Sequence, residues 1–272
     1  MKSQSIFILS AFVLLTSCEK HDRQNHENGK SSWVEKVVTK DNGPVKERTV
    51  TGDFDEIEVS QAIDAEIIKS DVEKVVISAP ENIIDEVLVD NSGGELHIHY
   101  KPGIRVMNTH NVSAKIYTKD FSKLNANSAA KITVKDKFVQ DKMEVEVSSS
   151  GSVSGDLEAN DFDISSNSSG SFSGKIWAVD LSVDASSAAS IDVSGKAKKA
   201  DVSSSSGSSL SAKNLIAENV SAEASSGASV DISASSSIKA EASSGGSVSV
   251  YKKGNVTNVT KEESSGGSVT IQ

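Results

Sequence analysis

Three histidines are the residues of this chain best suited to bind a metal ion. His97 and His99 are two residues apart in an alternating apolar and polar stretch, so on a β-strand they share one face. With His110 they offer imidazole nitrogens, which are common zinc ligands. No Glu or Asp cluster with matching spacing accompanies them. The pattern favours a solvated strand face, and we predict no metal ion and no cofactor.

The single cysteine carries a stronger signal. Lys2 precedes an apolar run over residues 6–15 that is too short to span a bilayer but typical of a signal peptide. The run ends in Leu15-Thr16-Ser17-Cys18, which resembles a bacterial lipobox, where small residues precede a cysteine whose thiol takes a diacylglycerol chain. We predict a lipoprotein signal peptide over residues 1–17, lipidation of Cys18 and a membrane partner held through several acyl chains. The alternative is an ordinary signal peptide with an incidental free thiol.

Serine makes up about a fifth of the chain, which invites a hydrolase interpretation. However, no Gly-x-Ser-x-Gly turn lies between a predicted strand and a helix. Asp192 and Asp231 follow apolar anchors and do not occupy the fixed turn positions of calcium-binding β-rolls.

Polysaccharide-cleaving β-helices need clustered Asp with Lys or Arg, often beside aromatic platforms. Aromatic residues are few in the C-terminal half, Trp177 and Phe172 among them, and we interpret Lys196, Lys198 and Lys199 as a solvated corner. The sequence therefore predicts no catalytic residue and a protein that is not an enzyme.

The charge balance excludes one class of partner. The 272 residues include 28 Lys and Arg against 38 Asp and Glu, a formal net charge of −10. A nucleic-acid binder would carry a basic patch, so we expect no nucleic-acid partner.

The elements around these residues are β-strands. Residues 18–46 are polar and aperiodic and are predicted to be a flexible tether, in which Trp33, Val34, Val37 and Val38 either dock a short segment on the domain or stay disordered. Residues 47–125 alternate with period two and are predicted to be an N-terminal β region, with a helical turn or a strand over residues 83–90 and a turn at 91–94.

Residues 126–272 contain a repeat. A Ser-Ser block followed by Gly or Ala and then by alternating apolar residues recurs along this segment. The anchor apolar residues stand 18 to 21 positions apart and are Ile132, Val153, Phe172, Ile191, Leu210, Val230, Val248 and Val269. Upstream pairs such as Val145/Val147, Phe162/Ile164, Leu181/Val183 and Ala200/Val202 repeat with them.

One repeat is too short to bury its own core, whereas stacked repeats bury a continuous one. The small residues suit tight corners, because Gly accepts positive φ. We therefore predict an all-β protein: a parallel β-solenoid of about eight coils of roughly 20 residues over 126–272, preceded by the N-terminal β region.

From about residue 47 to 272 the chain resembles a known family, the putative auto-transporter adhesin, head GIN domain proteins of Gram-negative envelopes. The resemblance rests on the segments 54–59, 80–84, 94–98 and 112–117 and on the Ser-Ser-Gly repeats. It implies a right-handed parallel β-helix-like fold. At the motif that gives the family its name this chain has Ala62-Ile63-Asp64 in place of Gly-Ile-Asn.

These observations predict a lipid-anchored, non-enzymatic protein of the cell envelope, at the periplasmic face or the cell surface of the outer membrane of a Gram-negative bacterium. It would act as an adhesin or display module for a glycan, matrix or protein partner. One alternative is a structural periplasmic or envelope scaffold, and a lower one is a β-helix polysaccharide-degrading enzyme. The last strand, Ser268 to Ile271, would leave an open edge. We expect either self-association through this edge or a cap from residues 251–261.

Overall fold

The computed structural model describes residues 36–38, 43–106 and 111–272. The signal peptide predicted over 1–17, Cys18, and His110 lie outside these residues. No helix of the described part has the length and hydrophobicity of a membrane span. The elements are β1 Lys36–Val38, β2 Val45–Thr51, β3 Glu56–Val59, β4 Asp64–Lys69, β5 Lys74–Pro80, η1 Ile84–Glu86, β6 Val87–Ser92, β7 Glu95–Tyr100, β8 Ile104–Val106, β9 Ser113–Thr118, β10 Lys123–Ala126, β11 Lys131–Val134, β12 Phe138–Val147, β13 Ser152–Ser166, β14 Ser171–Ala185, β15 Ser190–Ser204, β16 Ser209–Ala224, β17 Ser229–Ala242, β18 Ser247–Lys252, β19 Asn258–Glu263 and β20 Ser268–Ile271.

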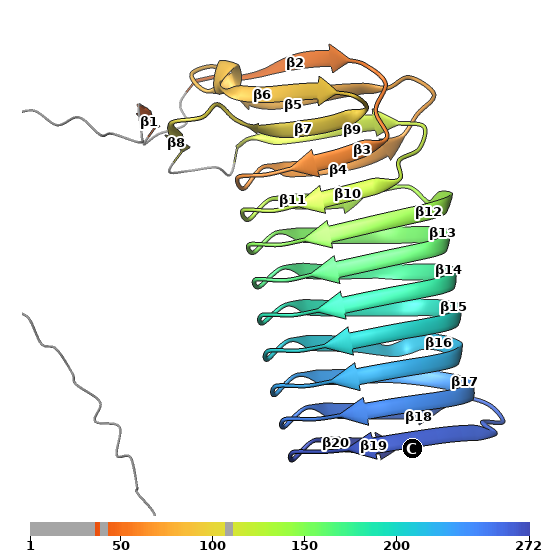
Figure 1. Ribbon diagram of the computed structural model, residues 1–272. Helices are drawn as coiled ribbons and strands as arrows, with labels where there is room; N and C mark the ends of the chain where they lie inside the picture. The colour runs from red at the N-terminus through yellow and green to blue at the C-terminus, as the bar shows by residue number, and fades with distance from the viewer. Residues whose placement is uncertain (1–35, 39–42, 107–110) are drawn as a thin grey trace, which may run out of the picture. The chain divides into compact units, whose positions relative to one another are not determined.

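The predicted β-solenoid is confirmed. Strands β12 to β18 lie one below another in parallel register, each hydrogen-bonded to the strands before and after it (Figure 1). The stacked parallel coils make about 8 turns. Within the described residues the only helical element is the 3-10 turn η1.

Each coil has three straight runs separated by two bends and one tight turn. In β14 the alternation of buried and exposed residues breaks at residues 174–175 and again at 179–180. The first run is therefore 171–173, the second 176–178 and the third 181–185. Buried side chains of all three runs point to one core, which extends through the stack.

The anchor residues form a single inward column. Val153 pairs with Phe172, Phe172 with Ile191 and Ile191 with Leu210, and the register continues to Val230, Val248 and Val269. Every predicted anchor is almost fully buried. The upstream pairs shift in one place: Phe162 pairs with Met143, and Val145 pairs with Ile164. The predicted pair Val145/Val147 therefore lies two positions later in its coil than the other pairs.

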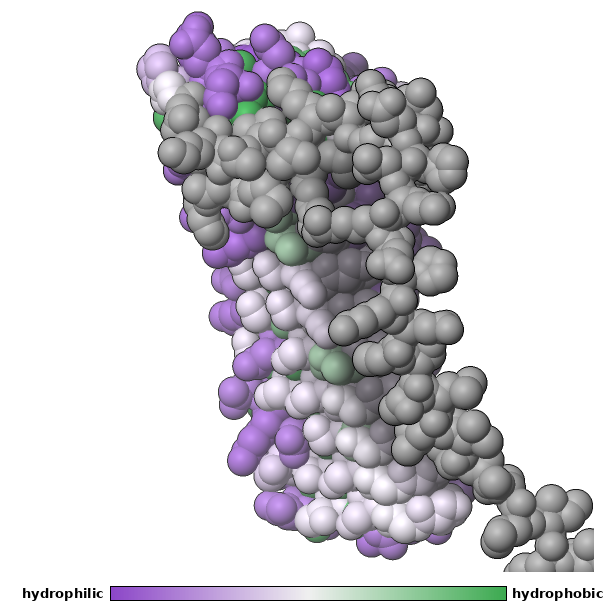
Figure 2. Space-filling view, turned by 90° about the vertical axis from the view of Figure 1, so that its left-hand side faces the viewer, coloured by the Kyte–Doolittle hydropathy of each residue, from purple (hydrophilic) through white to green (hydrophobic). Residues whose placement is uncertain are grey.

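The Ser-Ser blocks form the tight turns, and both central residues of each turn have positive φ. Ser187 and Ala188, for example, have φ of 52° and 61°. Two consecutive left-handed residues are typical of a type I′ turn. The amide of Ala188 donates to the carbonyl of Ser206 in the next turn at 3.2 Å, so neighbouring turns are hydrogen-bonded to each other. In Figure 2 this turn edge is a pale surface, because it consists largely of small uncharged side chains.

At the N-terminal end the order of stacking departs from the order of the chain. Strand β3 pairs in parallel with both β10 and β7, and β4 pairs with both β11 and β9. The coil made by β7 and β9 therefore stacks above the coil of β3 and β4, although it comes later in the sequence (Figure 1). Strand β10 crosses the boundary predicted between residues 125 and 126, so parallel stacking begins inside the N-terminal β region.

Antiparallel strands cover this end. Strand β6 pairs with β7, and β5 pairs with β9 and β2. The segment 83–90 contains both expected structures, the turn η1 and then β6. Within the predicted tether, β1 pairs in parallel with β8, which is the docking alternative for this short segment.

The C-terminal end is closed by charged side chains. In the last coil Lys261 and Glu263 pair with Ala240 and Ala242, which are buried inward residues of the coil above. Lys261 Nζ lies 3.1 Å from a carboxylate oxygen of Glu263, and that oxygen also accepts a hydrogen bond from the Val269 amide at 2.6 Å. An inward-pointing charge is a known protection of edge strands against pairing. Residues 258–261 belong to β19, which stacks on β17, so this part of the 251–261 segment forms the last coil; self-association through the edge stays a prediction.

Candidate functional site

An exposed row of side chains runs along the second runs of consecutive coils. The register aligns Val139 with Glu158, Glu158 with Trp177, Trp177 with Lys196, and Lys196 with Ile216. We call these five residues the Trp177 row. Its apolar members are the exception on this surface: Val139 is 61%, Trp177 40% and Ile216 38% exposed.

The local sequence forces Trp177 outward. Its neighbours Ile176 and Ala178 are both buried in the core, and side chains alternate along a strand. In the next coil, Gly195 pairs with Ile176 and has φ of +118°. A Cβ on Gly195 would lie 2.0 Å from the Ile176 carbonyl oxygen, so only glycine lets the two coils approach here.

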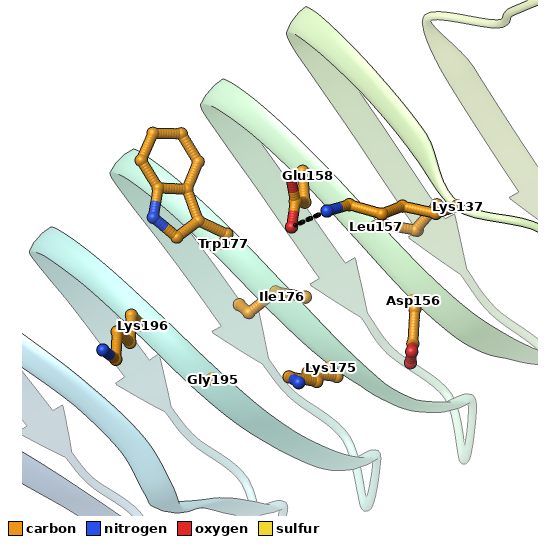
Figure 3. Close-up of a pocket in the computed structure, with 9 residues that line it drawn as sticks. All are labelled: Lys137, Asp156, Leu157, Glu158, Lys175, Ile176, Trp177, Gly195 and Lys196. Atoms are coloured by element: carbon orange, nitrogen blue, oxygen red, sulfur yellow. Dashed lines mark ion pairs between the residues drawn. The ribbon is translucent and has the colours of Figure 1, made fainter.

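Hollows flank the indole on both sides. The first has a volume of about 250 Å³ and lies between Trp177, Lys175, Asp156 and Glu158 (Figure 3). The second, of about 330 Å³, lies between Trp177, Lys196, Ile216 and Glu218. A large aromatic surface between two concave regions with a few polar groups is typical of a binding site.

Cations without carboxylate partners surround this surface. Lys137 forms an ion pair with Glu158 at 2.7 Å (Figure 3), whereas Lys175, Lys196 and Lys198 form no ion pair in the part of the chain that the structure describes. The unpaired groups beside Trp177 are these three lysines and the carboxylates of Asp156 and Glu218, so their net charge is positive, although the whole chain carries a formal charge of −10.

Carboxylates gather instead on the third runs of the coils. The outward column there passes through Glu146, Asp184, Glu223, Glu241 and Glu262. Burial raises the pKa of the neighbouring Asp163, and the charge of Asp161 raises it further. The solenoid thus has one acidic side and one side with unpaired lysines.

The histidines form a compact polar cluster at the N-terminal end. The rings of His97 and His99 stack with centroids 4.1 Å apart, and His99 Nε2 lies 3.0 Å from Asp90 Oδ2. In the described residues no group of three or more His, Cys, Asp or Glu side chains is arranged to hold a metal ion. Burial lowers the pKa of His97; the charge of Glu58 opposes this, and His99 lowers the pKa further.

A serine also contacts this cluster, but without the geometry of a catalytic relay. Ser60 Oγ lies 3.1 Å from His97 Nε2, and Glu58 Oε1 lies 3.6 Å from the same nitrogen. In a hydrolytic triad the acid holds one ring nitrogen while the other takes the proton of the nucleophile. Because both contacts are made to Nε2, the cluster does not have this arrangement.

The structure separates residues that the sequence grouped together. Phe172 is 1% exposed and belongs to the core, so of the two aromatic residues only Trp177 reaches the surface. Lys196, which the sequence placed in a solvated corner with Lys198 and Lys199, lies in a run beside Trp177, whereas Lys199 pairs with Asp201. The sequence reasoning missed Lys175 and Ile216. The spacing could have shown Ile216, because Glu158, Trp177, Lys196 and Ile216 follow one another at the repeat distance.

The stacked coils place the chain in the class of parallel β-solenoid proteins. The sequence gives a narrower assignment. The family model for "Putative auto-transporter adhesin, head GIN domain" matches residues 53–175 and 152–254. The chain belongs to this family. None of the curated proteins compared with it matches.

Solved structures share the fold at low identity. A "putative adhesin" from Parabacteroides distasonis is 19% identical, with a TM-score of 0.78 over 87% of this chain and 100% of that chain. A "putative adhesin" from Parabacteroides merdae is 19% identical, with a TM-score of 0.76 over 84% and 98%. A "putative lipid binding protein" from Parabacteroides distasonis is 22% identical, with a TM-score of 0.75 over 87% and 100%.

Proposed function

We propose that the chain is a non-enzymatic adhesion module of the cell envelope, anchored by lipid at Cys18, whose solenoid presents the Trp177 row to a glycan or protein partner. Membership of an adhesin family supports the general role. The single observation that carries the proposal is the exposed indole of Trp177 between two hollows. Aromatic side chains at the centre of a surface are frequent anchors of binding.

The scaffold around Trp177 suits display on a surface. Each coil is hydrogen-bonded to both neighbours, so the row is held by a rigid sheet and not by a loop. The repeat serines support a non-enzymatic role, because they occupy turns that hold the coils together.

Binding is tested by replacing the indole. We expect Trp177→Ala to lower the attachment of cells that display the full chain to immobilised glycans or matrix proteins. Val72→Ala is the matched control, because Val72 is 61% exposed at a turn of the N-terminal end, away from the row. Equal attachment by the two variants would refute the role of the row.

The anchor is tested by metabolic labelling with an alkyne fatty acid. We expect Cys18→Ser to lose the label and to leave the membrane fraction, because the thiol is the group that carries the lipid. Ser17→Ala, which keeps a small residue before the cysteine, should be labelled normally. Retention of the label by Cys18→Ser would contradict the lipoprotein assignment.

Exposure on the cell separates adhesion from a scaffold role. We expect protease added to intact cells to remove the chain. A chain that is cut only after the outer membrane is opened would instead favour the periplasmic scaffold. Release of reducing ends from a polysaccharide by the purified chain would favour the enzyme alternative.

A further inference from the structure

The apolar members of the Trp177 row recur at every second coil. Val139, Trp177 and Ile216 alternate with Glu158 and Lys196 in one unbroken register. Adjacent parallel strands lie about 4.8 Å apart, so the apolar side chains stand roughly 10 Å apart along the solenoid axis. This distance is close to the length of two pyranose rings joined by an equatorial linkage.

We propose that the Trp177 row binds a linear anionic polysaccharide, laid along the solenoid axis with one disaccharide for every two coils. This inference rests on the proposed function, because it names the ligand class of the same surface. The C–H face of a pyranose ring is apolar and its rim is polar. An exposed indole, which is flat and carries one N–H donor, fits such a ring.

The charges around the row determine the sign of the charge that the ligand should carry. Lys175 and Lys196 lie on adjacent coils at the hollow beside Trp177, and Lys198 lines the second hollow. None of the three forms an ion pair within the described chain, although Asp156 lies opposite Lys175 in the register, whereas Glu158 is paired with Lys137. A sugar carboxylate or sulfate could therefore accept charge-assisted hydrogen bonds from these lysine side chains.

The remaining polar groups suit hydroxyls better than charges. Asp156 borders the first hollow and Glu218 the second, and both are exposed. Their carboxylates can accept hydrogen bonds from sugar hydroxyls. They would repel a polysaccharide whose sugar units carry negative groups along both edges of the chain. The acidic third runs repel a polyanion, which confines it to the side of the coils that carries Trp177.

A row on flat runs favours an extended chain over a folded partner. The two hollows open on either side of one indole and are lined by consecutive coils, so a ligand that fills both must continue along the axis. An extended acidic peptide could make the same salt-dependent contacts, but its period does not match the two-coil spacing. It is therefore an outcome of the test and not part of the proposal.

The test measures binding of the purified full-length chain to defined polymers by biolayer interferometry. Polymannuronate, whose rings are joined by equatorial linkages, supplies a carboxylated chain, its methyl ester the same backbone without charge, cellulose sulfate an equatorially linked sulfated chain and poly-glutamate an acidic peptide. We expect at least one of the two anionic polysaccharides to bind more tightly than the methyl ester, and affinity to fall with added salt. The preferred polymer distinguishes a carboxylate from a sulfate ligand.

Variants assign the binding to the row. We expect Trp177→Ala to weaken binding about tenfold or more, as for an anchor residue. The pair Lys175→Ala and Lys196→Ala should lose most of the salt dependence, whereas Lys253→Ala, an exposed lysine near the C-terminal end, should not. Circular dichroism should be unchanged in all variants, because every replaced side chain is exposed.

Several results would overturn the inference. They are equal binding by Trp177→Ala and the unmodified chain, equal loss in Lys253→Ala, binding to poly-glutamate as tight as to the polysaccharides, or no binding to any polyanion. If Trp177→Ala abolishes cell attachment while no polyanion binds, the adhesion role stands and the ligand class is wrong. If a polyanion binds through Trp177 but attachment is unaffected, the ligand class stands and the adhesion role fails.

Discussion

At the scale of single residues, the turn positions carry the largest backbone constraint. The first left-handed residue of each successive turn is a serine, from Ser128 in the first turn to Ser265 in the last. The second is Ala, Ser or Gly. A left-handed conformation costs a residue with a Cβ roughly 1–2 kcal/mol, and glycine avoids this cost. The motif Ala62-Ile63-Asp64 occupies the equivalent turn, where Gln61 and Ala62 have φ of 60° and 57°. A glycine in the family motif would therefore serve the turn conformation.

The constraint can be measured at two adjacent coils. Gly207 has φ of +71° and open space around the place of its missing Cβ. We expect Gly207→Ala to lower the free energy of unfolding by about 1 kcal/mol, from backbone strain alone. Ala188→Gly, at the equivalent turn position, should not lower it. Chemical denaturation measures both, and a loss of stability in Ala188→Gly would show that side-chain contacts dominate these turns.

His97 gives the N-terminal end a dependence on pH. Its folded pKa is lowered by burial, so the unfolded chain takes up the proton first as pH falls. Stability should therefore fall as pH drops below the ordinary histidine value of about 6.5 and down through the folded pKa. We expect His97→Gln to flatten this part of the profile. Denaturation midpoints between pH 5 and 8 measure it, and equal slopes in the two proteins would exclude His97 as the cause.

At the scale of elements, the last coil differs from the others by two inward charges. We expect replacement of Lys261 by Val and Glu263 by Ala to produce association that grows with concentration, because the end of the core becomes an apolar, unprotected edge. The unmodified chain should not associate through this end. Light scattering over a range of concentrations measures both.

A matched control lies one coil above. Lys239 and Glu241 form an ion pair at 2.6 Å, and they occupy outward positions. Replacing them by Val and Ala removes the same charges without opening the core, and this variant should remain like the unmodified chain. Association of both variants to the same extent would point to net charge and not to the cap.

At the scale of the whole solenoid, each coil depends only on its two neighbours. Ser190 pairs with Ser171 on one side and with Ser209 on the other, so removal of residues 190–208 joins equivalent positions of two coils. We expect this deletion to fold into a solenoid one coil shorter, because every remaining inward column continues. Circular dichroism and thermal unfolding of the purified chain measure the outcome.

A deletion of half a coil is the control. Removal of residues 190–199 deletes the first and second runs of one coil and joins the turn residue Ala189 directly to Ala200 of the third run, so inward and outward positions no longer align. This variant should not fold. If the two deletions unfold the chain equally, the coils do not act as separable units.

The repeat was predictable because a solenoid imposes the same demand on every coil. All eight anchors, from Ile132 to Val269, were placed from spacing alone, and each lies in one buried column. The candidate site was less predictable. The sequence pointed to Trp177 and Lys196 but did not show that they share a surface. Side chains 19 residues apart become neighbours only through the register of the stacked strands.

The sequence by itself determined the solenoid architecture, the position of its turns and its inward columns. It could do so because translation along the axis returns each residue type to the same environment about every 20 residues. Only the tertiary structure decided which coil lies above another at the N-terminal end, where β7 and β9 stack on β3 and β4. It also decided that Lys261 and Glu263 close the far end and that Trp177 stands beside Lys175, Lys196 and Ile216. These features depend on pairings between distant segments and on the ends of the stack, where the periodic environment stops and the local pattern no longer specifies the neighbours.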